Sequence, residues 1–308
     1  VFQFLYSYEK TSKHTSNFES YSKNIFSDLE KSIDAIFPLY LELLSLPIHF
    51  FKLNSNDKNI SKKSIIKKNE SNYNISQNKI ISVLKNNKIF VNELLKNNIT
   101  IKNTSDIVKD WYKLLLKDSE FAKYENKKKP SKKEDYQFLR YINTTFIFKI
   151  KEVDAYYADK DLFWSEDRLI VKSMIKKTSN LLNSIKLDKF AFAQLSADLS
   201  EDKKFANDLY KNVLQSSKYF DSLIGLSSQN WDIERIATID KILLKMGICE
   251  FLDFSNIPVK VTINEYIDIA KKYSTPKSKR FINGVLDVLS KKIKDKIHKT
   301  GKGLIDNK

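Results

Sequence analysis

The carboxylates that come in pairs in this sequence are not spaced as a catalytic pair. Glu166 and Asp167 are adjacent, and Asp159 and Asp161 are two residues apart. On a helix, residues at these separations do not share a face. General acid–base catalysis requires groups that reach the same substrate. We therefore interpret these carboxylates as solvated surface charges.

Cysteine and histidine also give no catalytic or metal-binding pattern. Cys249 is the single cysteine and lies in an apolar stretch with no histidine close to it in sequence, so a buried small side chain is favoured over a nucleophile. The three histidines, His14, His49 and His298, are too widely spaced for a zinc motif. The sequence predicts no enzyme, no metal and no cofactor, and its cysteine content is typical of the reducing cytoplasm.

Glycine is scarce and confined to the end of the chain. All five glycines follow residue 224, so no early strand is followed by a glycine-rich loop that could bind a nucleotide phosphate. The 308 residues contain only five prolines. Because both residues interrupt helices and form turns, their scarcity predicts long helices and an all-α protein.

The chain is strongly basic, with 54 Lys and Arg against 38 Asp and Glu and a formal charge of +16. This charge favours a polyanionic partner such as a nucleic acid. A compositional bias towards lysine is an alternative, since only four of the basic residues are arginine. Residues 52–133 hold 20 basic and 8 acidic side chains, so most of the excess lies in an irregular stretch and does not locate a site.

No membrane or targeting segment is predicted. The most apolar window, residues 33–51, contains Asp34 and Glu42, and a charge at the centre of a membrane helix costs about 2.5–3.5 kcal/mol. The window predicts a soluble core helix with a kink or break at Pro38. The chain opens on Val1 without a basic leader, which we interpret as a helix entered partway along, with residues missing upstream.

Helical periodicity recurs along the chain, apart from an Asn, Ser and Lys-rich stretch at 54–78 that predicts a flexible linker. Near the carboxyl end, Thr262–Glu265 matches a capping box and Thr275–Pro276 matches a second helix start. Gly247 allows a close approach of two helices. The last helix is expected to turn these side chains inward: Phe281, Val285, Val288 or Leu289, and Ile293.

Two segments here, Pro258–Glu265 (PVKVTINE) and Lys279–Asp287 (KRFINGVLD), resemble the signature stretches of the NusB family of bacterial transcription antitermination factors. The segment Ile236–Glu250 resembles the central helix of the family, and Val1–Tyr6 resembles the end of its first helix. Two motifs in the right order at a plausible interval form a more specific signal than either alone.

The resemblance implies an all-α, NusB-like helical bundle with a large additional helical region inserted after the first helix, as in the enlarged NusB proteins of Bacteroidetes. The expected organisation is an amino-terminal helical region over 1–200, with the first helix (1–12) belonging to the bundle and 18–200 forming the insert, then an RNA-binding domain over 201–300 and a frayed tail over 301–308.

The function implied by the resemblance is non-enzymatic and cytoplasmic. NusB proteins bind the single-stranded boxA segment of ribosomal leader RNA together with the ribosomal protein NusE, within the antitermination complex of RNA polymerase. The arginine-rich stretch that precedes the first helix of the family is not in this chain, so that part of the RNA contact is not expected.

The RNA-binding residues expected from the resemblance combine cations for phosphates, rings for stacking and amides for base edges. We expect the two helix starts of the signature stretches to lie side by side as a cationic cradle. The residues are Lys260, Lys279, Arg280, Phe281, Tyr6, Gln3 and Asn283.

Each of these residues has a structural alternative. Phe281 and Tyr6 fit core packing, and the cations fit an ordinary solvated surface. Asn283, beside Gly284, fits a buried amide at a close helix crossing.

Two residues are expected to face the protein partner. Asp240 corresponds to the acidic residue of the central helix, with an exposed helix carboxylate as the alternative. Lys277 reverses the charge that the family often has before the last helix.

Two other functions compete with antitermination. A helical scaffold or adaptor would keep the bundle without specific RNA binding. An RNA methyltransferase fusion would need a glycine-rich methyl-donor site, and the sequence has no such site.

Overall fold

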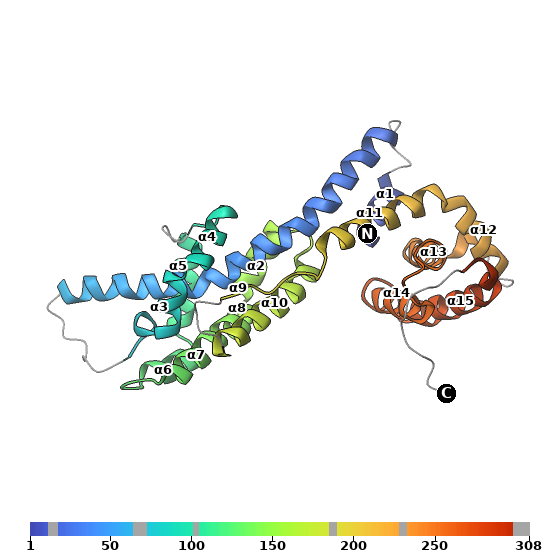
Figure 1. Ribbon diagram of the computed structural model, residues 1–308. Helices are drawn as coiled ribbons and strands as arrows, with labels where there is room; N and C mark the ends of the chain where they lie inside the picture. Colours follow the sequence, from blue (N-terminus) through green and yellow to red (C-terminus); the bar gives the residue numbers. More distant parts are fainter. Residues whose placement is uncertain (12–17, 64–72, 101–104, 185–189, 228–232, 298–308) are drawn as a thin grey trace. The chain divides into compact units, whose positions relative to one another are not determined.

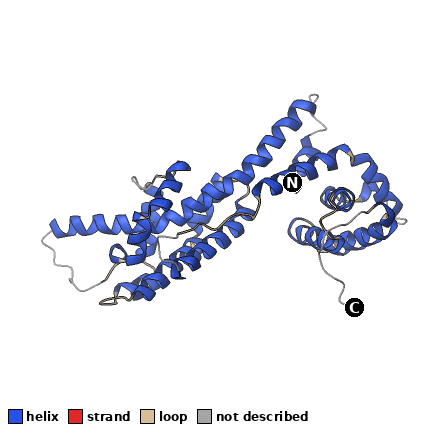
Figure 2. Ribbon diagram, in the orientation of Figure 1, coloured by secondary structure: helices blue, strands red, loops and turns tan. Residues whose placement is uncertain are grey.

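In the part of the chain that it describes, the computed structural model consists of helices joined by loops, with no strand (Figures 1 and 2), which confirms the all-α prediction. His14, His298 and the expected tail 301–308 lie outside this part. The described residues are 1–11, 18–63, 73–100, 105–184, 190–227 and 233–297.

The chain forms two compact units, and one of them is discontinuous in sequence. The first unit combines residues 1–31 with 198–308, and the second unit comprises residues 32–197. The division at 31/32 lies inside a helix, so residues 18–31 of the expected insert belong to the first unit. The helices of the first unit are α1 (Phe2–Thr11), the beginning of α2 (Phe18–Lys63), α11 (Leu199–Gln215), α12 (Ser217–Ser227), α13 (Thr238–Asp253), α14 (Val259–Tyr273) and α15 (Ser278–Lys292).

Helix α13 is the centre of the first unit. It contacts α1, α11, α12, α14 and α15, and every residue from 242 to 251 is buried. A helix in this position is apolar on almost all sides. Its sequence, TIDKILLKMGICEFLD, meets that requirement except at a few charged positions.

Three charged residues of α13, Asp240, Lys245 and Glu250, are buried and have partners on surrounding elements. Lys245 donates hydrogen bonds to Ser217 (2.6 Å) and Asp221 (2.9 Å) on α12. Glu250 accepts a hydrogen bond from the Tyr266 hydroxyl on α14 at 3.2 Å. Because an unpaired buried charge is costly, each of these contacts fixes where its neighbouring helix packs.

Helices α14 and α15 form an antiparallel pair joined by residues 274–277. Gly247 faces the middle of this pair. A Cβ atom built on Gly247 would lie 2.8 Å from Leu286 Cδ2 and 3.4 Å from Tyr266 Cδ2. The close approach that the sequence suggested at this glycine is therefore present.

Both expected helix starts in this pair are displaced. Helix α14 begins at Val259 with Pro258 at its N-cap, and Thr262 instead lies within the first turn, its hydroxyl 3.5 Å from the Pro258 carbonyl. The fixed φ of proline starts the helix ahead of the capping box. Helix α15 begins at Ser278 rather than after Thr275. Its inward residue is Leu289, whereas Val288 is exposed.

The second unit is built on the remainder of α2. Tyr40, Leu43 and Leu44 of α2 are fully buried in its core. The helix continues through Pro38 and Pro47, so the break considered at Pro38 is absent. The other elements are a 3₁₀ turn (Ile75–Gln77), α3 (Lys79–Asn86), α4 (Lys88–Lys96), α5 (Asp106–Leu116), α6 (Ser119–Glu125), α7 (Lys132–Tyr141), a π-helical turn (Ile142–Phe146), α8 (Ile147–Lys149), α9 (Lys151–Lys160) and α10 (Trp164–Ser184).

Part of α2 is long and apolar enough to span a membrane, but it is largely a core helix. The segment Ile25–Asn56 passes a test of length and composition, and 67% of its most apolar window is buried inside the protein. Burial of this kind is typical of the central helix of a helical domain.

The linker predicted at 54–78 is wrong for the residues that the structure describes. Residues 54–63 continue α2, and Tyr73 and Asn78 are buried. The Asn78 side chain accepts from the amides of residues 80 and 81, and donates to Tyr124 and to the Asp135 carbonyl. A polar stretch can be buried because its amide groups satisfy backbone and side-chain partners.

Two glycines of the first unit provide a matched test of the packing around α13. We expect Gly284→Ala to stabilise the protein by about 0.5–1 kcal/mol, because no atom lies within 4 Å of the new methyl group and alanine favours the helix. Gly247→Ala should instead destabilise it by about 1 kcal/mol, because Leu286 must move within a full core. Chemical denaturation measures both, and equal effects would contradict the packing described here.

His49 should make the second unit sensitive to acid. Burial and the neighbouring Lys52 lower the pKa of His49 from 6.5 to about 4. Stability from the neutral side chain is complete above pH 6.5 and is lost as the pH falls towards 4, by about 3 kcal/mol. His49→Gln cannot be protonated in this range, so its unfolding free energy should decline less between pH 7 and 4. Parallel pH profiles of the two proteins would contradict this prediction.

Candidate nucleic-acid interface

Basic side chains gather where α14 ends and α15 begins. Lys279 and Arg280 are exposed in the first turn of α15, and Lys277 is exposed just before it. Lys272 lies in the last turn of α14, across the short connection. Within the described part of the chain, no ion pair neutralises Lys277, Lys279 or Arg280. This end of the helix pair therefore carries a concentration of positive charge.

Asp240 holds the connection that presents these cations. Its carboxylate accepts hydrogen bonds from the hydroxyls of Ser274 (2.6 Å) and Ser278 (2.7 Å). The two hydroxyls lie 2.9 Å apart, and Thr275 completes the cluster. These hydrogen bonds hold the α14–α15 connection against the first turn of α13. The position of the connection in turn sets the positions of Lys277, Lys279 and Arg280.

The burial of Asp240 changes what can be expected of it. The residue is 6% exposed, so it is not the exposed helix carboxylate considered from the sequence. Both of its oxygens are used within the protein. Its contact with a protein partner stays a prediction, and Lys277 is the exposed member of the predicted pair.

Helix α1 brings an amide and aromatic rings to the same end of the α14–α15 pair. The Gln3 amide donates to the Tyr273 hydroxyl at 3.3 Å, and the Phe2 ring lies 5.1 Å from the Tyr273 ring. Tyr6 is half-buried one turn further along α1, with Lys10 Nζ 5.4 Å from its ring centroid. We call the group Gln3, Lys272, Tyr273, Lys277, Lys279 and Arg280 the hairpin-end surface.

Lys260 does not belong to the hairpin-end surface. It lies in the first turn of α14, and Tyr273 is 13 residues further on, about 20 Å along the helix axis. In an antiparallel pair the two helix starts lie at opposite ends, so Lys260 is level with the end of α15. The cradle expected from the two helix starts lying side by side is wrong.

The remaining expected residues follow the hairpin-end surface along α15. Phe281 is half-buried, whereas Asn283 is exposed. Gly284 faces open space, so the alternative of a buried amide at a helix crossing is wrong for Asn283. Asn283 is therefore accessible to a ligand.

Lys272 and Tyr273 were not predicted from the sequence, although a signal was present. The run Lys271–Tyr273 directly precedes a four-residue connection to a second basic segment. A short connection between two helices implies that the end of one lies beside the start of the next. The contact of Tyr273 with Gln3, 270 residues earlier, has no local signal.

The groups considered for catalysis do not form a site. Cys249 is buried, and burial together with Asp253 raises the pKa of its thiol. Asp167 is buried rather than solvated, which corrects the interpretation from its spacing. Burial, Asp161 and Glu166 raise the pKa of Asp167 to about 7. The described residues include no group of three His, Cys, Asp or Glu that could hold a metal.

Comparison with known proteins places the similarity in the carboxyl-terminal part. The model of the NusB family matches residues 165–291. Proteins named transcription antitermination protein NusB are 40% identical over 126 residues in Chloroherpeton thalassium, 42% over 118 in Salinibacter ruber and 42% over 105 in Thermodesulfovibrio yellowstonii. These matches cover 39%, 37% and 34% of this chain and 60%, 74% and 70% of the relatives, respectively. No solved structure matches.

Removing the Asp240 carboxylate should loosen the hairpin end. We expect Asp240→Ala to destabilise the protein by about 2–3 kcal/mol, because the hydroxyls of Ser274 and Ser278 lose their shared acceptor in a buried site. Asp240→Asn retains one carbonyl acceptor and serves as the milder control. Chemical denaturation measures the difference, and a wild-type free energy for the alanine variant would show that the contact does not stabilise the connection.

Proposed function

The chain belongs to the NusB family, and we propose that it is a transcription antitermination factor that binds boxA-type single-stranded RNA of the ribosomal leader together with NusE. The observation that supports RNA binding most directly is the hairpin-end surface, where Lys277, Lys279 and Arg280 have no carboxylate partner in the described part of the chain. Unneutralised cations of this kind attract the phosphates of RNA.

The chemistry of the hairpin-end surface suits an unpaired strand more than a duplex. The cations of the hairpin-end surface would contact phosphates. The Arg280 guanidinium and the half-buried Phe281 ring would stack on bases. The amides of Gln3 and Asn283 would hydrogen-bond to base edges. Tyr6 belongs to the same proposed site through α1, whereas Lys260 would contact only RNA that reaches the far end of α14.

The proposed partners follow from the relatives and from the exposed residues of the first unit. NusE would bind beside the α14–α15 connection, where Lys277 is exposed. Asp240, the other residue predicted to contact the partner, is largely buried and holds this connection through Ser274 and Ser278. The assembly would act on RNA polymerase in the cytoplasm, as a non-enzymatic factor. The chain spans 60% of the length of the Chloroherpeton relative. We therefore assign these proposed activities to the part of the chain that matches the relatives.

Charge reversal at the hairpin end tests the proposal against a matched control. Lys279→Glu with Arg280→Glu should weaken binding of a boxA-like RNA in the presence of NusE by roughly tenfold or more, because both side chains are proposed to contact phosphates. Lys260→Glu with Lys292→Glu makes the same change in charge at the opposite end and should have a smaller effect. Affinity is measured over a range of salt concentrations, and the wild-type log–log slope should be about −3 to −4 for four to six phosphate contacts.

Three results would contradict the proposal. Equal losses in the two variants would indicate bulk electrostatics rather than a site. Equal affinity for boxA-like and scrambled RNA would favour the scaffold function. No gain in affinity on adding NusE would remove the partner from the proposal. Unchanged helicity in each variant, measured by circular dichroism, excludes unfolding as the cause.

A further inference from the structure

The second unit has an open cavity of about 680 Å³ along α7. Its walls come from α7 and the π-helical turn, with Ile80 of α3 and Leu182 of α10 contributing apolar surface. We call this cavity the α7 groove. None of the residues that form it belongs to the hairpin-end surface, and all of them lie within residues 32–197.

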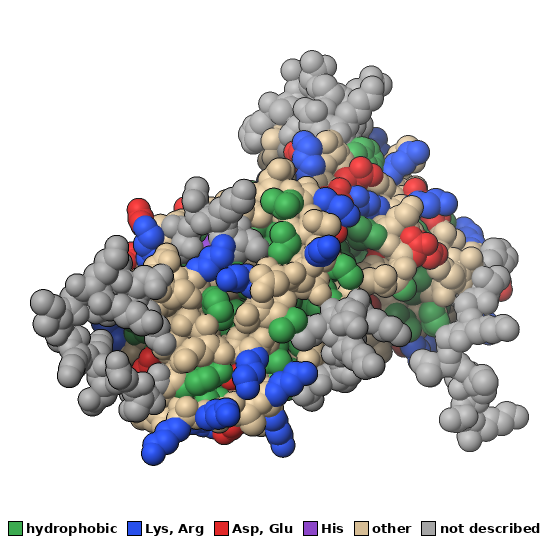
Figure 3. All heavy atoms as spheres, turned by 60° about the vertical axis from the view of Figure 1, so that its left-hand side comes forward, with side chains coloured by type: hydrophobic (Ala, Val, Ile, Leu, Met, Phe, Trp, Pro, Cys, Tyr) green, Lys and Arg blue, Asp and Glu red, His purple; other side chains and the backbone are tan. Residues whose placement is uncertain are grey.

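The α7 groove is lined by cations and by no carboxylate. Lys132, Lys133 and Arg140 line it and are exposed. None of the three makes an ion pair with the described residues. In the space-filling view, Lys and Arg side chains gather along the lower edge of the face drawn (Figure 3).

The acidic residues of α7 are withdrawn from the groove. Glu134 is paired with Lys127 at 2.5 Å and also bonds to the backbone and hydroxyl of Ser131, completing the capping box of α7. Asp135 is fully buried and accepts a hydrogen bond from the Tyr124 hydroxyl at 2.7 Å. One side of the helix therefore keeps its positive charge unopposed.

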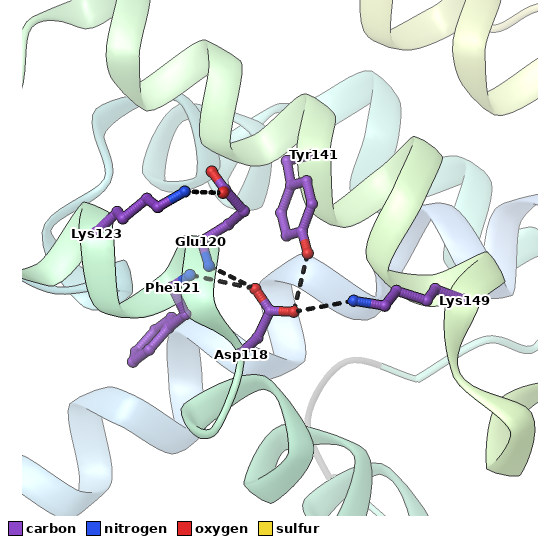
Figure 4. Close-up of polar contacts among 6 residues, drawn as sticks. All are labelled: Asp118, Glu120, Phe121, Lys123, Tyr141 and Lys149. Atoms are coloured by element: carbon purple, nitrogen blue, oxygen red, sulfur yellow. Dashed lines mark hydrogen bonds and ion pairs between the residues drawn. The ribbon is translucent and has the colours of Figure 1, made fainter.

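The α7 groove also offers aromatic and amide groups. Tyr136, Gln137 and Tyr141 line it beside the cations. The Tyr141 hydroxyl donates to Asp118 Oδ2 at 2.9 Å, which fixes the position of the ring (Figure 4). Asp118 is itself held as the N-cap of α6 and lies 4.0 Å from Lys149 Nζ (Figure 4).

The backbone at the end of the α7 groove is unusual. Residues 142–146 form a π-helical turn, and its Thr144 and Thr145 line the groove. Such turns are rare within helices and occur frequently at functional sites. The Thr144 hydroxyl donates to the Arg140 carbonyl at 2.8 Å, which joins the turn to the helix that holds the cations.

We propose that the α7 groove is a second binding site for single-stranded RNA, which holds nucleotides that flank the boxA-type element. Cations beside tyrosine rings and an amide are the side chains that grip an unpaired strand, whereas an acidic protein segment would require only the cations. The inference rests on the proposed function, because two sites on one RNA strand raise the effective concentration of each for the other.

The test compares two RNAs on the full chain with NusE present. One RNA contains only the boxA-like element, and the other extends it on both sides with unstructured nucleotides. The wild-type protein should bind the extended RNA about tenfold more tightly. The groove variant Lys132→Glu, Lys133→Glu and Arg140→Glu should lose this gain and keep its affinity for the short RNA.

A matched control makes the same charge change elsewhere in the second unit. Lys109→Glu, Lys113→Glu and Lys123→Glu alter exposed lysines of α5 and α6 that are already paired with carboxylates. This variant should retain most of the gain. The uncharged variant Lys132→Gln, Lys133→Gln and Arg140→Gln provides a second test, and it should lower the salt slope for the extended RNA by about 2.

The outcomes separate this inference from the proposed function. Equal wild-type affinity for the two RNAs, or equal losses in the groove and control variants, would overturn the second site alone. Binding of the extended RNA only, lost in the groove variant, would support the groove and contradict the hairpin-end surface. No binding of either RNA would overturn both. If the extended RNA binds no more tightly than the short RNA, and polyglutamate binds in the α7 groove, the groove would be assigned to an acidic protein segment instead of RNA.

Discussion

The burial of α13 is the constraint on which the first unit depends. Ten successive residues of this helix are removed from water, and the charged side chains Asp240, Lys245 and Glu250 are among the buried set of the helix. A buried charge without a partner would oppose folding, so each selects one neighbouring element and fixes its position. The apolar residues supply the stability, whereas the charged residues decide which packing arrangement is adopted.

The proposed RNA site is a consequence of that packing. Asp240 holds the connection between α14 and α15, and the cations of the hairpin-end surface lie on either side of this connection. Helix α1 reaches the same place because its aromatic residue Phe2 packs against Tyr273. Residues from the two ends of the sequence thus form one surface.

The second unit uses buried polar groups in a similar way. Asn78 and Asp135 satisfy backbone and tyrosine groups inside the core, which allows a polar segment to be buried. The same arrangement turns the acidic residues of α7 inward or pairs them, and so leaves its cations on the groove side. Burial of acids and exposure of bases are therefore two results of one packing solution.

The sequence by itself determined the helical class and the recurrence of helical segments along the chain. These follow from local properties, because periodicity, capping residues and the scarcity of glycine act over a few residues. Gly247 and the inward residues Val285 and Leu289 also follow from such a pattern.

Tertiary structure decided which of the predicted residues meet. The antiparallel pairing of α14 and α15 separated Lys260 from Arg280 and brought Tyr273 to Gln3, because direction and register depend on contacts between distant segments. The burial of Asp240, Tyr73 and Asn78 was likewise decided by partners far away in the chain or on other elements. A local pattern specifies how a segment folds, whereas the solvation of a polar side chain depends on what packs against it.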